Sequence, residues 1–253
     1  MISANTISAR TAQSVRDRRT RRLIIYGDSV LRGITYSPDR QMHLLCRGYR
    51  LERLAALGFA VENRSRMGAT VERGLNRMES DAAAGADFLS PASEDEKRPL
   101  MLLEYGGNDC DFHWRAIADD PLGEHHPRTS EARFREAYRR MIDLARSLGF
   151  EVLLSAVIPM DAERFLHTVA CGREREILRW LGDVARIARY QEYYSRLVEQ
   201  IARASACPYL DTRTPLLFAP NFGDLLSADG IHPTDEGHDF IEEILCEKLK
   251  NFL

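Results

Sequence analysis

Four short segments of the chain contain the residue types that acyl transfer would need. Ser29 stands in a Gly-Asp-Ser sequence, and its hydroxyl could serve as a nucleophile. Asp229 stands three residues before His232, so its carboxylate could orient an imidazole that accepts the serine proton. Gly68 could present a backbone N–H and Asn108 a side-chain amide, and such donors stabilise the oxyanion of acyl transfer.

Each segment has a simpler explanation when it is taken alone. Gly-Asp-Ser is common in turns that cap a helix, and Gly-Gly-Asn and Asp-x-x-His are common in loops. Ser29 also lacks the second glycine of the G-x-S-x-G nucleophile elbow, because Val30 and Leu31 follow it. The case for acyl transfer therefore depends on whether the fold brings the four segments together.

Short apolar segments alternate with amphipathic segments along most of the chain. The first kind is typical of buried strands, and the second has the apolar spacing of helices. We expect strands at 23–26, 59–63, 99–105, 150–158 and 207–210, helices at 41–58, 69–83, 130–148, 174–205 and 234–252, and loops at 86–98 and 109–129. This alternation predicts one α/β domain, residues 23–253, with about five parallel strands between two layers of helices.

The four chemical segments all follow strands in this scheme. Gly-Asp-Ser follows the first strand, Gly68 the second, Asn108 the third, and the segment from Asp229 to His232 the fifth. The carboxyl ends of parallel strands meet at one edge of a sheet, where open α/β sheets bind their ligands. We therefore expect these side chains to gather in one crevice.

Composition and charge argue against several other classes of protein. The chain has 253 residues, with 35 Lys and Arg against 38 Asp and Glu, and this balance is not that of a nucleic-acid-binding protein. No apolar run is long enough for a membrane span, and the N-terminus has no apolar signal core. The five cysteines are scattered without C-x-x-C spacing, which indicates free thiols and a cytoplasmic protein. Residues 1–22 carry six Arg and are expected to be a basic extension, either solvated or an anchor for an anionic partner.

The combination of segments resembles the SGNH hydrolase (GDSL-like esterase/lipase) superfamily. Its four signature positions correspond to Ser29, Gly68, Asn108 and His232, which stand in GDSV, after the second strand, in GGND and in DGIHP. The likeness extends over residues 27–233 and includes the flavodoxin-like order of strands and helices in a three-layer α/β/α fold. Val30 replaces the leucine of the family's name, at a position that varies.

The resemblance implies a role for each residue. Ser29 would be the nucleophile, His232 the general base and acid, and Asp229 the residue that orients His232. The backbone N–H groups of Ser29 and Gly68 and the Asn108 side chain would form the oxyanion hole. The implied reaction is hydrolysis of a small or carbohydrate-linked acyl ester through an acyl-enzyme, without metal or organic cofactor. A thioesterase, an acyltransferase or a catalytically silent binding protein could use the same residues.

The loop after the third predicted strand offers weaker alternatives. Asp109, Asp111 and His113 could suggest a metal site, but their spacing fits a loop better than a known ligand pattern. Cys110 has no histidine near it by motif and is expected to be a small buried hydrophobe. Trp114 could line a substrate pocket or simply pack its own loop.

The segment 161–205 is rich in aromatic residues and longer than a plain crossover requires. It could pack as core, or it could form a wall or lid that selects the substrate. Its aromatic side chains would also suit a sugar ring, which is the only sign of a carbohydrate ester.

Overall fold

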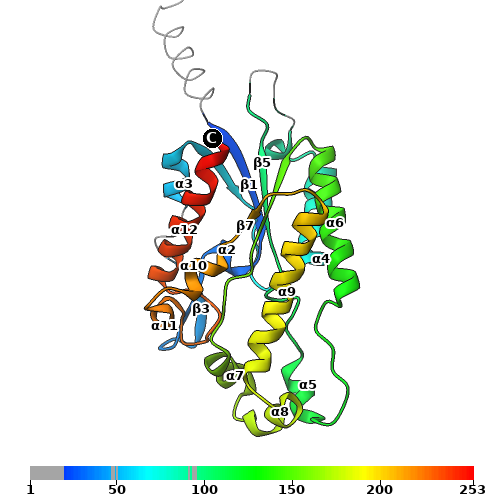
Figure 1. Cartoon of the computed structure of the whole chain (residues 1–253), viewed down its shortest axis with the longest axis vertical. Coiled ribbons are helices and arrows are strands. Elements are labelled where there is room, and N and C mark those ends of the chain that lie inside the picture. The colour runs from blue at the N-terminus through cyan, green and yellow to red at the C-terminus, as the bar shows by residue number, and fades with distance from the viewer. Residues whose placement is uncertain (1–19, 47–48, 50, 91, 93–95) are drawn as a thin grey trace, which may run out of the picture.

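Five parallel strands form the central sheet of the computed structural model, which describes residues 20–46, 49, 51–90, 92 and 96–253 (Figure 1). The strands are β1 (Arg21–Gly27), β4 (Phe59–Asn63), β5 (Leu100–Glu104), β6 (Glu151–Ser155) and β7 (Tyr209–Leu210). Their order across the sheet is β4-β1-β5-β6-β7, and every neighbouring pair is parallel. The predicted α/β class, the number of strands and the flavodoxin-like order are confirmed.

Helices cover both faces of this sheet (Figure 1). One face carries α4 (Val71–Ala83), α6 (Glu131–Ser147) and α9 (Ala185–Ala204), and the other carries α3 (Glu52–Leu57) and α12 (Asp235–Leu249). Met101 and Leu103 of β5 pack into the cluster under α4, α6 and α9. Leu100 and Leu102 pack into the cluster under α3 and α12. Because both faces are covered, β5 is an uninterrupted buried segment and not an alternating one.

A third apolar cluster lies beyond the carboxyl edge of the sheet, at the bottom of Figure 1. It is formed by α5 (Trp114–Asp119), α7 (Ala162–Ala170), α8 (Glu174–Leu181) and the start of α9, and we call residues 112–119 and 162–190 the cap. The ring of Phe112 contacts the rings of Trp114, Trp180 and Tyr190. These contacts give the cap a small core of its own.

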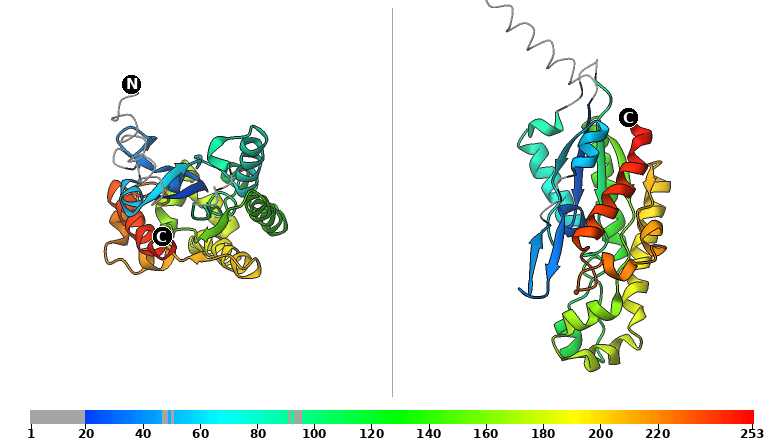
Figure 2. Two further views of the ribbon diagram at one scale, coloured as in Figure 1. Left: turned by 90° about the horizontal axis from the view of Figure 1, so that it is seen from above. Right: turned by 90° about the vertical axis from the view of Figure 1, so that its left-hand side faces the viewer.

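The helix predicted at 41–58 is wrong over its first half. Met42–Leu45 forms strand β3, which pairs antiparallel with β2 (Ile34–Ser37), and α3 begins only at Glu52. Met42 and Leu45 are about half exposed, so the apolar spacing that suggested a helix face does not mark a buried face. The two strands form a hairpin that stands apart from the main sheet in the right-hand view of Figure 2.

The start of the sheet also differs from the prediction. β1 begins at Arg21, so Arg21 and Arg22 belong to the sheet and not to the basic extension. The Arg21 guanidinium lies 2.6 Å from a carboxylate oxygen of Glu151 and is almost buried. The rest of the predicted extension, residues 1–19, lies outside the described residues.

Several short helices interrupt segments that the sequence analysis treated as loops or left open. They are α2 (Ser29–Arg32), α10 (Arg213–Leu217), α11 (Phe222–Leu225) and the 3-10 turn η1 (Asp87–Leu89). The helix predicted at 234–252 is α12 up to Leu249, and its last three residues form the 3-10 turn η2 (Lys250–Phe252). The predicted loop at 109–129 contains α5, and the region 174–205 is divided into α8 and α9. Within the described ranges, no helix combines the length and the apolar character needed to cross a membrane.

Candidate active site

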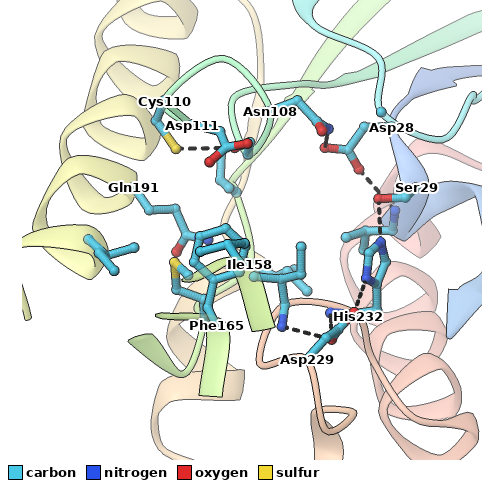
Figure 3. Close-up of a pocket in the computed structure, with 18 of the residues that line it drawn as sticks. Asp28, Ser29, Asn108, Cys110, Asp111, Ile158, Phe165, Gln191, Asp229 and His232 are labelled. Atoms are coloured by element: carbon cyan, nitrogen blue, oxygen red, sulfur yellow. Dashed lines mark hydrogen bonds and ion pairs between the residues drawn. The ribbon is translucent and has the colours of Figure 1, made fainter. Parts of the chain in front are cut away.

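The sequence-predicted site residues lie together at the carboxyl edge of the sheet. The strand order reverses at β1, and ligands of doubly wound sheets bind at such a point. A cavity of about 210 Å³ lies there, and its lining includes Ser29, Gly68, Asn108, Asp229 and His232. Figure 3 shows four of these side chains around the opening, between the sheet edge and the helices of the cap. The fold thus brings together segments that are up to two hundred residues apart in the chain.

Ser29 is positioned by the sharp turn between β1 and α2. It is the first residue of α2, and Asp28 before it caps the helix by accepting the Val30 N–H at 2.9 Å. Gly33, in the left-handed region, ends α2 after one turn. The hydroxyl oxygen of Ser29 lies 3.0 Å from Nε2 of His232, which is within hydrogen-bond distance.

Asp229 and His232 are held by a tight loop before α12. One oxygen of Asp229 accepts the backbone N–H groups of Ile231 and His232, at 3.2 and 3.1 Å. The other lies 2.6 Å from Nδ1 of His232. Gly230 has a φ of 78°, and a Cβ at this position would lie 2.5 Å from the carbonyl oxygen of Asp161. Only glycine allows this turn, which makes Gly230 necessary for the Asp229–His232 contact.

The electrostatics of this pair favour a charged carboxylate on Asp229. Burial alone would raise the pKa of Asp229, but its hydrogen bonds with His232 and with the backbone hold that pKa below its ordinary value. A carboxylate facing Nδ1 keeps the imidazole proton on Nδ1. Nε2 is then free to accept a proton from Ser29.

Two other residues can supply hydrogen-bond donors to the same cavity. Nδ2 of Asn108 donates to Asp28 at 3.1 Å, which engages one of its two amide hydrogens and leaves the second for a ligand. Gly68 has a φ of 68°, and nothing lies within 4 Å of the position of a Cβ there. A side chain would have space at this position, so the positive φ of the backbone is what favours glycine here.

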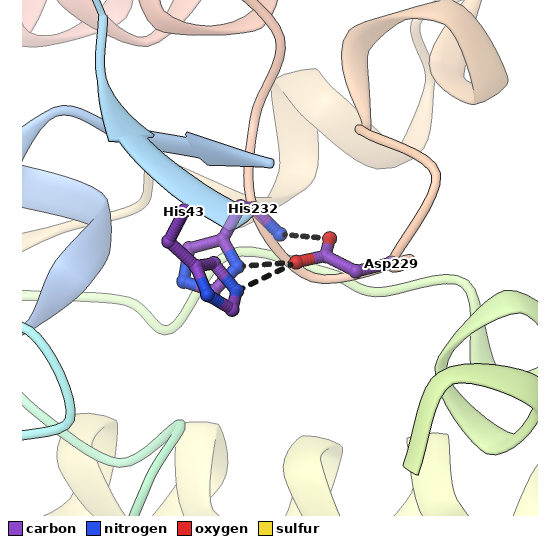
Figure 4. Close-up of side chains that lie close together, drawn as sticks. All are labelled: His43, Asp229 and His232. Carbon is purple, nitrogen blue, oxygen red and sulfur yellow. Dashed lines mark hydrogen bonds and ion pairs between the residues drawn. The ribbon is translucent and has the colours of Figure 1, made fainter. Parts of the chain in front are cut away.

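His43 is a member of the site that the sequence analysis missed (Figure 4). Its Nε2 lies 3.3 Å from the Asp229 carboxylate, and its ring meets the ring of His232 at a centroid distance of 4.6 Å. Burial and the facing His232 lower the pKa of His43 below its ordinary value, which disfavours a positive charge on its ring. The hairpin that carries it is anchored by a 3.0 Å contact between the hydroxyls of Thr35 and Ser227. The sequence signal for a strand at this place is the alternation of apolar and polar residues in Met42-His43-Leu44.

Among the described residues, one group of three has possible metal-ligand atoms that all lie within 4.8 Å of one another, and it consists of His43, Asp229 and His232. The 2.6 Å contact between Nδ1 of His232 and Asp229 suits one shared proton. Zinc, which forms bonds of about 2.0–2.1 Å to nitrogen and oxygen, would have to separate this pair. The present geometry therefore fits a hydrogen-bonded chain better than a metal centre.

The alternatives in the loop after β5 have structural partners of their own. Both oxygens of Asp109 lie 3.1 Å from the N–H of Val71, at the start of α4. Asp111 accepts the indole N–H of Trp114 at 2.7 Å. Cys110 is buried, which raises the pKa of its thiol well above the ordinary value and disfavours a thiolate nucleophile.

The cap forms the apolar wall of the cavity opposite Ser29. Trp114, Phe165, Val169, Ile187 and Tyr190 all line it, and they come from α5, α7 and α9. The segment 161–205 therefore both packs into a core and forms one wall of the cavity. Trp114 lines the cavity and also packs its own loop, so both interpretations of this residue apply.

Comparison with known proteins gives a family and a fold. The model of the GDSL-like Lipase/Acylhydrolase family matches residues 25–240. No curated protein matches the chain. A lipase/acylhydrolase from Enterococcus faecalis has 19% identity and a TM-score of 0.60, over 92% of this chain and 97% of that one. A GDSL-like lipase from Bacteroides thetaiotaomicron has 21% identity and a TM-score of 0.58, over 98% and 96%. A variant of a Geobacillus acetyl-xylooligosaccharide esterase has 19% identity and a TM-score of 0.59, over 92% and 96%.

Proposed function

We propose, from the premise that the chain belongs to the GDSL-like Lipase/Acylhydrolase family of carboxylic ester hydrolases, that it hydrolyses its ester through an acyl-enzyme on Ser29. In this proposal His232 is the general base and acid, and Asp229 orients it. The backbone N–H groups of Ser29 and Gly68 and the side-chain amide of Asn108 form the oxyanion hole.

The reaction follows from the hydrogen-bonded chain. Ser29 Oγ attacks the ester carbonyl carbon while Nε2 of His232 takes the hydroxyl proton, and the carbonyl oxygen becomes an oxyanion. When the tetrahedral intermediate collapses, the alcohol leaves with the proton from Nε2. Water then attacks the acyl-enzyme with His232 again as base, which releases the acid and restores the Ser29 hydroxyl.

One observation carries the proposal. Asp229, His232 and Ser29 form a continuous chain with contacts of 2.6 and 3.0 Å, and all three side chains are buried at the sheet edge. In this order the imidazole can accept the hydroxyl proton, and the buried carboxylate stabilises the imidazolium that forms. A silent binding protein would need neither the order nor the distances.

The cavity favours an apolar acyl group. The wall opposite Ser29 consists of aromatic and aliphatic side chains of the cap, with Trp114 and Phe165 packed edge to face at 5.9 Å. Each of these two rings is only 7% exposed, so they offer no open platform for a sugar ring. We therefore place the acyl chain against the cap. This placement leaves the alcohol side of the ester free for a carbohydrate, and the Geobacillus relative is named for an ester of that class.

The first test is hydrolysis of p-nitrophenyl acetate, butyrate and octanoate by the unmodified protein and by Ser29→Ala. We expect kcat to fall by about 10⁴-fold or more in Ser29→Ala, because the residual rate of such variants comes from binding and the oxyanion hole alone. Ser147→Ala, in α6 and outside the cavity, is the matched control and should keep full activity. Equal rates in Ser29→Ala and the unmodified protein would refute the nucleophile.

The same measurement separates substrate classes. A rise in kcat/KM from acetate to octanoate supports an apolar acyl chain against the cap, and a preference for acetate contradicts it. An octanoyl thioester measured in parallel shows whether the protein acts as a thioesterase. Folded protein that cleaves none of these compounds would favour a silent binding protein.

A further inference from the structure

Glu104 is a buried acid with no assigned task. It is the last residue of β5, it follows four buried apolar residues, and it is only 2% exposed. Both of its carboxyl oxygens are buried, and no side-chain N–H or hydroxyl group of the described residues donates a hydrogen bond to them. Buried polar groups are nearly always paired, so an acid in this position calls for a structural explanation.

The Glu104 carboxyl lies directly behind the turn that carries Ser29. β1 and β5 are in register with Gly27 opposite Glu104. A Cβ on Gly27 would lie 3.2 Å from a carboxyl oxygen of Glu104 and 3.1 Å from the hydroxyl of Ser65, which is also buried and unpaired. The glycine before Asp28 therefore leaves the space that the Glu104 carboxyl occupies.

Asp28 is the second buried carboxyl at this place and connects it to the cavity. It is 3% exposed, one of its oxygens accepts the Val30 N–H, and the other accepts the Asn108 amide at 3.1 Å. The Glu104 carboxyl lies within hydrogen-bond reach of the Asp28 carboxyl, and both line the cavity together with Asn108.

Two ionised carboxylates side by side in this buried position would repel each other, and neither could donate a hydrogen bond. A single proton bound by the pair removes one of the two charges and creates one hydrogen-bond donor. Burial, together with the Asp28 charge, raises the pKa of Glu104 well above its ordinary value. Asp28 has donors of its own from Val30 and Asn108, so the proton belongs on Glu104.

We propose that Glu104 is a positioning residue: it stays protonated and donates to Asp28, and the Asp28 carboxylate in turn holds the Asn108 amide in the oxyanion hole. This inference rests on the proposed function, because it assumes that Asn108 binds the oxyanion. It adds a role for the Gly-Asp pair that precedes Ser29. The glycine makes room for the Glu104 carboxyl, and the aspartate transmits its hydrogen bond to Asn108.

The test compares Glu104→Gln with Glu104→Leu. Glutamine is neutral and keeps a donor, so its kcat should stay within a few-fold of the unmodified protein. Leucine keeps the volume but has no donor, so kcat should fall by about 10- to 100-fold with little change in KM. The upper limit is Asn108→Ala, because loss of one oxyanion donor costs about 10²–10³-fold in kcat.

A double-mutant cycle shows whether Glu104 acts through Asn108. In an Asn108→Ala background, Glu104→Leu should cost less than three-fold in kcat, since the group it positions is already absent. Glu242→Leu is the matched control: it removes another buried acid, on α12 and outside the cavity, and should leave kcat unchanged even if the protein melts earlier.

Each outcome decides the proposal. It is overturned if Glu104→Gln, with an unchanged melting temperature, loses as much kcat as Glu104→Leu, or if the two losses simply multiply in the cycle. If Glu104→Leu does not fold, Glu104→Gln alone carries the test, and a loss above ten-fold refutes the role. Failure of the proposed function is recognised separately, because Ser29→Ala would then retain activity.

Discussion

The carboxyl edge of the sheet and the cap face each other across one cavity, but different forces hold them. At the sheet edge the side chains of Asp229 and His232 are polar, buried and hydrogen-bonded. Asp229 alone accepts two backbone N–H groups and contacts the His232 imidazole. In the cap the contacts are between rings, as where Phe112 meets Trp180 and Tyr190 at 5.1 and 4.9 Å. The first set of contacts is directional, and the second is mainly apolar burial.

This difference suits the sheet edge to the reaction and the cap to the selection of the substrate. Hydrogen bonds fix atoms to within a few tenths of an ångström, which proton transfer between Ser29 and His232 requires. Apolar packing tolerates a change of side chain if the volume is kept, so the cap can change its substrate without disturbing the reaction. Variants of the sheet edge should therefore change kcat, and variants of the cap should change the preferred acyl chain.

Among variants that keep the Ser29 hydroxyl, the largest effect on kcat should come from Asp229→Asn. The amide can no longer hold the Nδ1 proton of His232 by charge, and kcat should fall by about 10³- to 10⁴-fold with little change in KM. Steady-state kinetics on the best p-nitrophenyl ester measure it. Asp224→Asn, in α11, is the control. A fall smaller than ten-fold would mean that the sheet edge does not work through this pair.

A smaller and more selective effect is expected from Val169→Phe in the cap. Val169 lines the cavity from α7, and the larger ring should fill space that a long acyl chain needs. We expect kcat/KM for octanoate to fall by about 10- to 100-fold, while the value for acetate changes by less than three-fold. Leu122→Phe is the control, because Leu122 is 75% exposed. An equal fall for both esters would contradict the division between edge and cap.

The smallest effect on activity is expected at Asp109, a residue of the sheet edge that serves stability. Asp109 ties the loop after β5 to the start of α4, and burial raises its pKa to about 7. The folded protein therefore holds this proton more tightly than the unfolded chain, whose aspartate pKa is about 3.9. The stabilising contribution is complete below that value and is lost as the pH rises through about 7.

Asp109→Asn should remove this pH dependence. The free energy of unfolding of the unmodified protein should fall, relative to that of the variant, on the order of 1–4 kcal/mol between pH 4 and pH 8. Urea unfolding at a series of pH values measures it. A parallel pH dependence in the two proteins would show that Asp109 does not titrate in this range.

The local chemistry and the order of the layers can be predicted from the residues alone. A segment such as Leu23 to Tyr26 is apolar enough to be a buried strand wherever it is placed, and alternation with amphipathic helices leaves few topologies. Given that topology, the positions of Ser29, Asn108 and His232 at one edge follow, because each stands after a strand. The sequence also accounts for Gly230, because a tight turn between Asp229 and His232 favours glycine.

Which distant residues join Ser29, Asn108 and His232 depends on the fold of the whole chain. The apolar spacing around Met42 suits a helix, and pairing of that segment with β2 replaces the helix by a hairpin and brings His43 to Asp229. Glu104 ends a strand that looks like any buried strand, and the role proposed for it depends on Gly27, which lies opposite, and on Asp28, which follows Gly27. The cap arises from packing between α5 and segments some fifty residues later. Register, pairing and packing between distant segments are set by the free energy of the whole chain, and no local pattern contains them.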